Sequence, residues 1–424
     1  MSKNWYRLDN AAMIFPPITN KLCPSTFCLS ATLDVKIDKS ILEKSVNEVL
    51  QSEDTFRVRL KKGIFWYYLE ENNKKPIIEE ETQKQMEFID YRKGDNFLFR
   101  VTYYENRISV TFFHSLTDGT GGLYFLKQIV YRYLVNSGFK VKTDDLIKAI
   151  DMPTTIEDKD DMFLKIKHKN KEKKIGEQRA CKLYGTPFKH FGTGIVYGEC
   201  SIDEVKKLAK EYDTTITGYL CAVYLYSMYK AYLENKHKKN KMLCVSVPIN
   251  IRKRHPSQTK RNFTLVIRIA YDFKNGATFE EVAASAAKQL KEKLTTNQID
   301  AQIRFNVSAE KNFFIKIMPR FLKNIVLKIA FHVRGTRQET TDLSNLGNIE
   351  LPASMKKHVK NIRFTLHSTK DLQKSLAMTG YDGKLYFSFA RRHVETDAEK
   401  YFFRMLSGNG VKCTVTSNNW EVAR

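Results

Sequence analysis

The stretch of residues 107–122, RISVTFFHSLTDGTGG, is the part of the sequence that decides the fold. Its first seven residues are rich in β-branched and aromatic side chains, which predicts a strand. The motif His114-Ser-Leu-Thr-Asp118-Gly119 comes next, and the helix-forming segment 123–134 follows two further glycines. We therefore expect a histidine, an acidic residue and several glycines at a turn between a strand and a helix. At such a turn a side chain can be held against a substrate.

Two interpretations of this motif compete. In the functional one, His114 acts as a general base, because the pKa of a histidine lies close to neutral pH. In the structural one, His114 is an ordinary turn residue and Asp118 only caps the following helix. In both, Gly119 is expected to adopt a turn conformation that β-branched residues avoid.

Length and composition favour a globular protein with two domains. The chain has 424 residues, enough for two domains of roughly 200 residues each. A hydrophobic content of 42% can fill two sizeable cores. Seven lysines fall between Lys159 and Lys174, which predicts a solvated linker. We expect an N-terminal lobe of residues 1–180, which carries the motif and ends in this lysine-rich linker, and a C-terminal lobe of residues 181–424.

The cellular setting is predicted from the segments that the sequence lacks. It contains no apolar run long enough for a transmembrane segment, and its first residues do not resemble a secretory signal. The seven cysteines are scattered and show no Cys-x-x-Cys spacing, which favours reduced thiols and no metal site. We therefore expect a cytoplasmic protein.

A formal net charge of +24 has three possible explanations. These are nucleic-acid binding, attraction to an anionic substrate or membrane surface, and a lysine-rich composition without a specific partner. Nucleic-acid binding is disfavoured, because the sequence shows no helix-turn-helix, zinc-finger or RNP-type signature. The other two explanations remain open.

Hydrophobic periodicity and turn residues predict a mixed α+β architecture. The expected strands are 27–37, 57–60, 64–69, 97–104, 107–113, 194–200, 242–248, 264–271, 362–366, 384–389 and 412–416. The expected helices are 40–50, 123–134, 202–211, 219–233, 279–294 and 397–406, with a basic helical region at 313–332 that is broken at Pro319. Capping boxes are expected at Ser40–Glu43, Ser201–Glu204, Thr278–Glu281 and Thr396–Glu399.

With these residues in place, the chain resembles the CoA-dependent acyltransferase superfamily. That superfamily includes chloramphenicol acetyltransferase, the condensation domains of nonribosomal peptide synthetases, wax-ester synthases and plant alcohol acyltransferases. Its H-x-x-x-D-G motif is matched at residues 114–119. Three further stretches, in the family order, resemble the bacterial alcohol acetyltransferase-like branch: VPINIR at 247–252 with Pro256-Ser257 and Arg261-Asn262-Phe263, SNLG at 344–347, and YDGKL at 381–385.

Two departures narrow the resemblance, which runs from about Tyr6 to near the C-terminus. Condensation domains carry two adjacent histidines, and Phe113 stands at the first of these positions, so a domain that forms peptide bonds is disfavoured. The D-F-G-W-G motif of the plant branch is missing. Plant-type substrates are therefore not expected.

The resemblance implies a fold and a reaction. The fold is an α/β sandwich of two chloramphenicol acetyltransferase-like lobes, which form a pseudo-dimer with an active-site channel between them. The reaction is acyl-CoA-dependent O-acylation, with an acetyl group passing directly to an alcohol or hydroxylated metabolite. His114 would take the proton of the hydroxyl group and pass it to the departing CoA thiolate, so no acyl-enzyme is required. N-acylation, or a non-catalytic condensation-like binding protein on the same fold, remains an alternative.

The resemblance also implies supporting residues and partners. Asp118 would pair with an arginine, and Arg252 is the candidate by its position in the motif; its alternative is a surface residue. Ser344 and Asn345 would supply polar groups near the channel, the alternative being an ordinary turn at a strand end, and Gly119 would support the loop. Acyl-CoA, in the first place acetyl-CoA, would be a co-substrate rather than a permanently bound cofactor. The acceptor would be a small alcohol or amine, and we expect a monomer.

Overall fold

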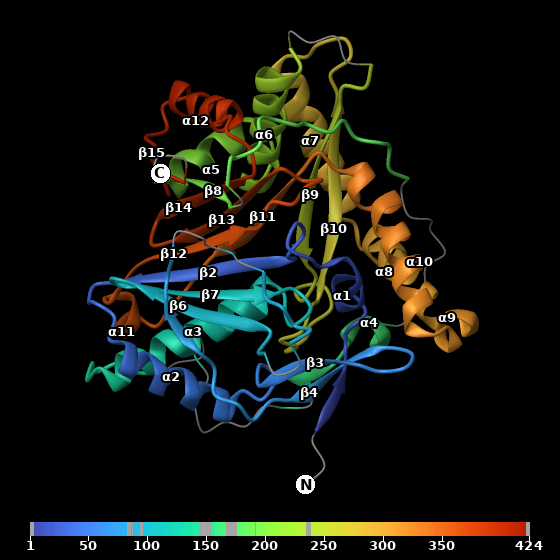
Figure 1. Cartoon of the computed structure of the whole chain (residues 1–424). Helices are drawn as coiled ribbons and strands as arrows, with labels where there is room; N and C mark the ends of the chain where they lie inside the picture. Colours follow the sequence, from blue (N-terminus) through green and yellow to red (C-terminus); the bar gives the residue numbers. More distant parts are fainter. Residues whose placement is uncertain are drawn as a thin grey trace.

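The computed structural model describes residues 4–82, 86, 88–93, 96–143, 147, 155, 157–166, 176–190, 192–234 and 239–420. Of the predicted lysine-rich linker, residues 167–175 lie outside this set. The described residues form two large sheets, one of five strands and one of seven, together with a smaller three-stranded sheet. Helices accompany both large sheets (Figure 1). No helix in the described residues has both the length and the apolar character needed to cross a membrane.

The N-terminal lobe is built on the five-stranded sheet, in the order β12-β2-β7-β6-β5. Its strands are β2 (Thr26–Leu33), β5 (Ile78–Glu80), β6 (Phe99–Tyr104), β7 (Arg107–Phe113) and β12 (Val359–Leu366). The three-stranded sheet β1-β4-β3 consists of β1 (Trp5–Arg7), β3 (Val58–Lys62) and β4 (Tyr67–Glu71). The helices are α1 (Phe15–Ile18), α2 (Lys39–Ser52), α3 (Gly119–Asn136), α4 (Met162–Lys165) and α11 (Ala353–Lys356).

The C-terminal lobe is built on the seven-stranded sheet, in the order β10-β9-β11-β13-β14-β8-β15. Its strands are β8 (Gly194–Ser201), β9 (Met242–Asn250), β10 (Thr264–Asp272), β11 (Thr341–Asn348), β13 (Lys374–Tyr381), β14 (Lys384–Arg391) and β15 (Thr414–Ser417). Its helices are α5 (Ile202–Glu211), α6 (Ile216–Tyr232), α7 (Phe279–Lys293), α8 (Thr296–Lys311), α9 (Phe313–Ile317), α10 (Arg320–Arg334) and α12 (Asp397–Gly408). Figure 1 shows α5, α6, α7 and α12 gathered together beside this sheet.

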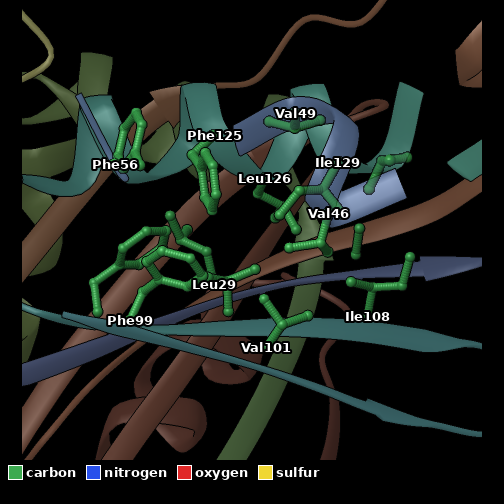
Figure 2. Close-up of a cluster of buried hydrophobic side chains, with 14 of the residues drawn as sticks. Leu29, Val46, Val49, Phe56, Phe99, Val101, Ile108, Phe125, Leu126 and Ile129 are labelled. Atoms are coloured by element: carbon green, nitrogen blue, oxygen red, sulfur yellow. The ribbon is translucent and has the colours of Figure 1, made fainter. Parts of the chain in front are cut away.

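Helices α2 and α3 cover one face of the five-stranded sheet. Successive side chains of a strand point to opposite faces, so every second residue of β2, β6 and β7 faces these helices. Figure 2 shows this core, in which side chains of the sheet meet side chains of the two helices: Leu29, Phe99, Val101 and Ile108 against Val46, Val49, Phe125, Leu126 and Ile129. The opposite face of β7 carries Ser109 and Thr111, which do not belong to this core.

Strand β12 links the two halves of the chain. It follows most of the C-terminal lobe in sequence, yet it pairs antiparallel with β2, from Leu366 opposite Phe27 to Val359 opposite Leu33. It also packs against β13 and β14 of the other sheet. The division of the chain at residue 180 remains a proposal, and β12 is a strand from beyond it that completes the N-terminal sheet.

The helix caps confirm one of the four predicted capping boxes, since at α7 both bonds of the Thr278–Glu281 box are present. At α5 only half of the box forms: Ser201 accepts from the backbone N–H of Glu204, and the Glu204 side chain accepts from Lys412 N instead. The prediction at α2 was wrong, because Asp38 is the cap and its side chain accepts from Ile41 N. The prediction at α12 was wrong as well. There the Glu399 carboxylate is buried and accepts hydrogen bonds from Lys374 Nζ at 2.6 Å.

Candidate active site

His114 lies directly after the last residue of β7, at the end of the sheet where the chain turns into α3. Its backbone N–H donates to Ser25 O at 2.9 Å, which continues the pairing of β7 with β2 by one residue. The imidazole ring stacks on Phe15 of α1, with 4.5 Å between ring centroids, and meets the edge of Phe27 at 5.1 Å. Two aromatic rings therefore fix the plane of the imidazole, and its side chain is half-buried.

A chain of hydrogen bonds orients the imidazole. His114 Nδ1 lies 3.0 Å from Asn262 Oδ1, and Asn262 Nδ2 donates to Asp9 Oδ2 at 3.1 Å. Because the amide nitrogen faces the carboxylate, the amide oxygen faces the ring and accepts a hydrogen bond from Nδ1–H. This assignment leaves Nε2 as the unprotonated nitrogen, which is the form a general base requires.

Burial shifts the pKa values of both ends of this chain. Loss of solvent lowers the pKa of His114, and the hydrogen bonds and the Asp118 charge oppose this effect only in part. The imidazole is therefore neutral at neutral pH. Burial, together with the nearby Asp161 charge, raises the pKa of Asp9 to about 7.

Asp118 is buried and is fully used in holding structure. Its Oδ1 accepts from the backbone N–H groups of Thr120 and Gly121, at 3.1 and 3.0 Å, and so caps α3. Its Oδ2 accepts from Arg252 Nη1 and from Phe263 N, each at 2.8 Å. The helix cap of the structural interpretation is thus present. The carboxylate also ties the loop to the C-terminal lobe.

Arg252 is the ion-pair partner that the motif suggested for Asp118. Its side chain is only 11% exposed, so the alternative of an exposed surface residue does not apply. The guanidinium also donates to Thr259 O and, at 2.7 Å, to Arg261 O. It therefore organises the β9–β10 connection as well as the loop.

The β9–β10 connection of the C-terminal lobe makes further hydrogen bonds to the His114 loop. Thr117 Oγ1 donates to Lys260 O at 2.6 Å, and Arg261 Nη1 donates to Leu116 O at 3.2 Å. A Cβ atom on Gly121 would lie 2.1 Å from Thr117 Oγ1 and 2.3 Å from Lys260 O. Gly121 is therefore the position where the two lobes approach too closely for a side chain.

The expectation for Gly119 was wrong. It is the first residue of α3 and is not among the glycines with positive φ, so it adopts no conformation that other residues avoid. A Cβ atom here would lie 2.5 Å from Leu346 Cδ2, the end of a flexible side chain. Since Leu346 belongs to β11, this short distance shows that β11 lies beside the start of α3.

Ser344 and Asn345 lie on β11, and nothing observed assigns them a catalytic role. Ser344 is buried. Asn345 Nδ2 donates to Thr217 Oγ1 at 3.0 Å, and its Oδ1 accepts from Gly347 N at 2.8 Å. The second bond closes a turn at a strand irregularity, where Gly347 has φ of +78°. Both residues pair with β13 inside β11, so the alternative of a turn at a strand end was wrong for them. The proximity of Leu346 to Gly119 keeps the segment near the His114 loop.

A polar cavity of about 840 Å³ lies between the two large sheets. Arg107, Ser109 and Thr111 of β7 line it, together with residues of β2, β6 and β12. Tyr197 of β8 and Thr416 of β15 close it from the other sheet. The lining does not include His114, but Thr111 is three residues before it on the same strand. Thr111 lies on the face of β7 that is turned away from the core under α2 and α3.

Ion pairs give the cavity wall its charge. Arg107 Nη2 lies 3.0 Å from Glu81 Oε1, and Ser109 Oγ donates to Glu81 Oε2 at 2.9 Å. Arg363 Nη2 lies 3.6 Å from Glu199 Oε2. Hydroxyl groups and paired charges therefore dominate the wall. Among the described residues no cluster of three or more His, Cys, Asp or Glu side chains is arranged to hold a metal ion.

Sequence reasoning missed four residues that contact the imidazole or its partner. Asn262 belonged to the recognised stretch Arg261-Asn262-Phe263, but it was assigned no role. The other three are Asp9, Phe15 and Phe27. Asp9 and Phe15 lie about 100 residues before His114, and nothing in their spacing links them to it. Only tertiary packing brings these side chains together.

Comparisons with known proteins identify the family of the chain. The family model for alcohol acetyltransferases matches residues 161–378, just over half of the chain. No curated protein matches the sequence significantly.

Solved structures with very low sequence identity share the fold over nearly the whole chain. One is polyketide synthase associated protein 5 from Mycobacterium tuberculosis, with a TM-score of 0.59, 12% identity and 96% of each chain covered. Another is TRI3 trichothecene 15-O-acetyltransferase from Fusarium sporotrichioides, with a TM-score of 0.58, 10% identity, and 96% of this chain and 94% of that one covered. A third, the starter condensation domain of rhizomide synthetase RzmA in complex with C8-CoA, gives the same four values. The predicted two-lobed acyltransferase fold is thereby confirmed.

Proposed function

Because the chain belongs to the alcohol acetyltransferase family, we propose that it transfers an acyl group, in the first place acetyl, from acyl-CoA to a hydroxyl group, with His114 as the general base. The family supports acyl transfer. The choice of oxygen as the acceptor atom and the role of His114 are our proposal. The observation that carries it is the oriented, neutral imidazole, whose Nδ1 is held by Asn262.

The proposed step needs one base and two substrates. His114 Nε2 takes the proton from the acceptor hydroxyl, and the oxygen forms a bond to the thioester carbonyl carbon. The C–S bond then breaks, and the imidazolium returns the proton to the CoA sulfur, so that an ester and free CoA leave. General-base assistance of this kind is worth about 10²–10⁴-fold in rate. Asp118 and Arg252 act on the loop rather than on the substrates.

The test is thiol release from acetyl-CoA with panels of alcohols and amines. We expect release with one or more alcohols in the unmodified protein, and a loss of about 10²-fold or more in His114→Ala. His190→Ala, at an exposed histidine outside the site, is the matched control and should retain activity. Release with amines alone would replace O-acylation by N-acylation. CoA-induced thermal stabilisation without turnover, for any acyl-CoA offered, would instead favour a non-catalytic binding protein.

The polar cavity supports a hydroxylated acceptor over a plain alkyl alcohol. Its wall along β7 offers hydroxyl groups and paired charges, and a buried polar wall costs free energy against an apolar ligand that leaves it unpaired. We therefore assign the polar part of the acceptor to this cavity. Thr111→Val, which removes one hydroxyl and keeps the volume, should raise the KM for the acceptor about three- to tenfold. Its KM for acetyl-CoA should stay unchanged, and an equal effect on both substrates would contradict the assignment.

A further inference from the structure

Helices α8, α9 and α10 carry a concentration of large exposed apolar side chains. Of nineteen large apolar side chains that are exposed in the described part of the chain, ten fall between Phe305 and Val333. Phe313, Phe314 and Phe321 are 66%, 73% and 63% exposed. A contiguous apolar surface of this kind marks an interaction site more often than chance, whereas scattered single residues need no explanation.

The exposed residues of α10 form one stripe. At 100° per residue, Phe321, Leu322, Ile325, Ile329 and Val333 fall within about 120° of the helix circumference. The opposite side of the helix is used by the fold, since Lys323 is buried there and α10 packs on α1. The apolar side chains of the outer stripe are therefore not needed to pack α10 against the rest of the protein.

A second segment of chain extends this stripe. The turn between β3 and β4 exposes 78% of Ile64 and 45% of Phe65. Arg320 N donates to Ile64 O at 2.9 Å, and Lys323 Nζ donates to Phe65 O at 3.1 Å. The turn is thus bonded to the start of α10. Figure 1 shows α9 and α10 at the periphery of the molecule, with the β3–β4 turn reaching toward them.

The charge around the stripe has one sign. Residues 311–338 contain seven lysines and arginines and no aspartate or glutamate. Lys311, Lys316, Lys328 and Arg337 are exposed. Two copies of this face would repel one another, which argues against a dimer built on it. An apolar stripe with flanking lysines and arginines complements a bilayer surface, where acyl chains take the stripe and anionic headgroups take the cations.

We propose that α9, α10 and the β3–β4 turn dock the protein peripherally on an anionic lipid bilayer. The apolar side chains enter the boundary between headgroups and acyl chains, and the lysines lie at the level of the phosphates. This inference does not depend on the proposed reaction, because it rests only on the exposed apolar side chains and the basic residues around them.

The full chain is tested by co-sedimentation with vesicles of phosphatidylcholine, with and without phosphatidylglycerol. We expect binding to the vesicles that contain phosphatidylglycerol and a loss of affinity as salt is added. The fourfold variant Phe313→Ser/Phe314→Ser/Phe321→Ser/Ile325→Ser should bind at least about tenfold more weakly, because several apolar side chains no longer insert. The matched control changes four exposed apolar residues elsewhere, Leu22→Ser/Ile77→Ser/Tyr184→Ser/Val394→Ser, and should bind as the unmodified chain does.

A charge variant provides a second test, in which the apolar side chains of the stripe are unchanged. Lys311→Gln/Lys316→Gln/Lys328→Gln should lose most of the preference for phosphatidylglycerol. Its matched control on α5, Lys206→Gln/Lys207→Gln/Lys210→Gln, should keep it, because those exposed lysines lie on another element.

Three results would overturn the proposal. The first is an unmodified chain that stays in the supernatant with phosphatidylglycerol vesicles at low salt. The second is a fourfold variant that melts as the unmodified chain does and binds equally well. The third is a dimer of the unmodified chain that the same variant dissociates, without vesicle binding by either; this would assign the face to a second copy.

Discussion

The neutral imidazole of His114 has a direct consequence for the pH dependence of the reaction. Burial lowers its pKa below the ordinary value of 6.5, so the unprotonated form that accepts the substrate proton persists on the acid side of that value. We expect kcat/KM to stay high as pH falls through 6.5 and to decline only at lower pH. A pH–rate profile measures this, and an acid limb at or above 6.5 would contradict it.

Asn262 is expected to be a positioning residue. In Asn262→Asp a carboxylate would replace the amide oxygen that lies 3.0 Å from His114 Nδ1, and it would favour the charged imidazole. The acid limb of kcat/KM should therefore move to higher pH, and kcat should fall while the KM for acetyl-CoA changes little. A purely structural role would leave the acid limb where it is. Asn262→Ala is the control, since it removes the hydrogen-bond acceptor without adding charge. It should lower kcat without moving the acid limb of kcat/KM to higher pH.

The sequence was sufficient to select His114 and the Asp118–Arg252 pair, because these residues lie in recognisable motifs. It could not supply Asp9, Phe15 or Phe27, whose chemistry is ordinary and whose distance from His114 in the chain is large. The error at Gly119 has a physical reason. A glycine in a motif suggests a special φ, whereas here the requirement for lack of a side chain falls on Gly121, set by the approach of Lys260.

At the scale of elements, the Asp118–Arg252 ion pair should be a major link between α3 and the β9–β10 connection. Both side chains are largely buried, so Asp118→Ala leaves a buried guanidinium without its counter-charge and removes the cap of α3. We expect the free energy of unfolding to fall by about 3–5 kcal/mol in a urea titration. In the double variant Asp118→Ala/Arg252→Met the loss should be smaller than the sum of the losses in the single variants Asp118→Ala and Arg252→Met. Additive losses would show that the pair is not coupled.

Two glycines at the start of α3 should respond differently to alanine. Gly121→Ala would push the new Cβ atom into Lys260 O and should destabilise by about 1–3 kcal/mol. Gly119→Ala meets only the end of the Leu346 side chain, which can rotate away, and should cost less than about 1 kcal/mol. Thermal unfolding of the two variants side by side measures this, and the reverse order would contradict the packing described for the loop.

Element prediction succeeded where periodicity was strong and failed where it was not. The break at Pro319 in the basic helical region is confirmed, since α9 ends before it and α10 begins after it. Helix α8 was missed, because its sequence TNQIDAQIRFNVSAEK is mostly polar and its buried stripe is narrow, formed by Ile299, Ile303 and Val307. Strand β13 was missed because it is buried along its whole length, so its residues show no alternation between apolar and polar.

At the scale of the molecule, β12 makes the two lobes interdependent. A chain of residues 1–180 lacks β12 and leaves β2 as an unpaired edge of the N-terminal sheet. We expect this piece to aggregate when it is produced alone and to become soluble when it is produced together with residues 181–424. Size-exclusion chromatography measures both outcomes, and a soluble, cooperatively melting 1–180 piece would contradict the prediction. Neither motifs nor periodicity predicts this pairing, because strand order is a property of the assembled sheets.

The hydrogen bond between His114 and Asn262 has a consequence for hydrolysis of the thioester by water. The base comes from one lobe and the atom that selects its tautomer comes from the other, so any motion that parts the lobes removes the acceptor from Nδ1. An opened molecule would then hold acetyl-CoA beside an imidazole that is no longer directed, while water is admitted to the site. If the chain has the proposed function, hydrolysis of acetyl-CoA would be limited under those conditions, because the imidazole would be directed for proton abstraction only when the lobes are together.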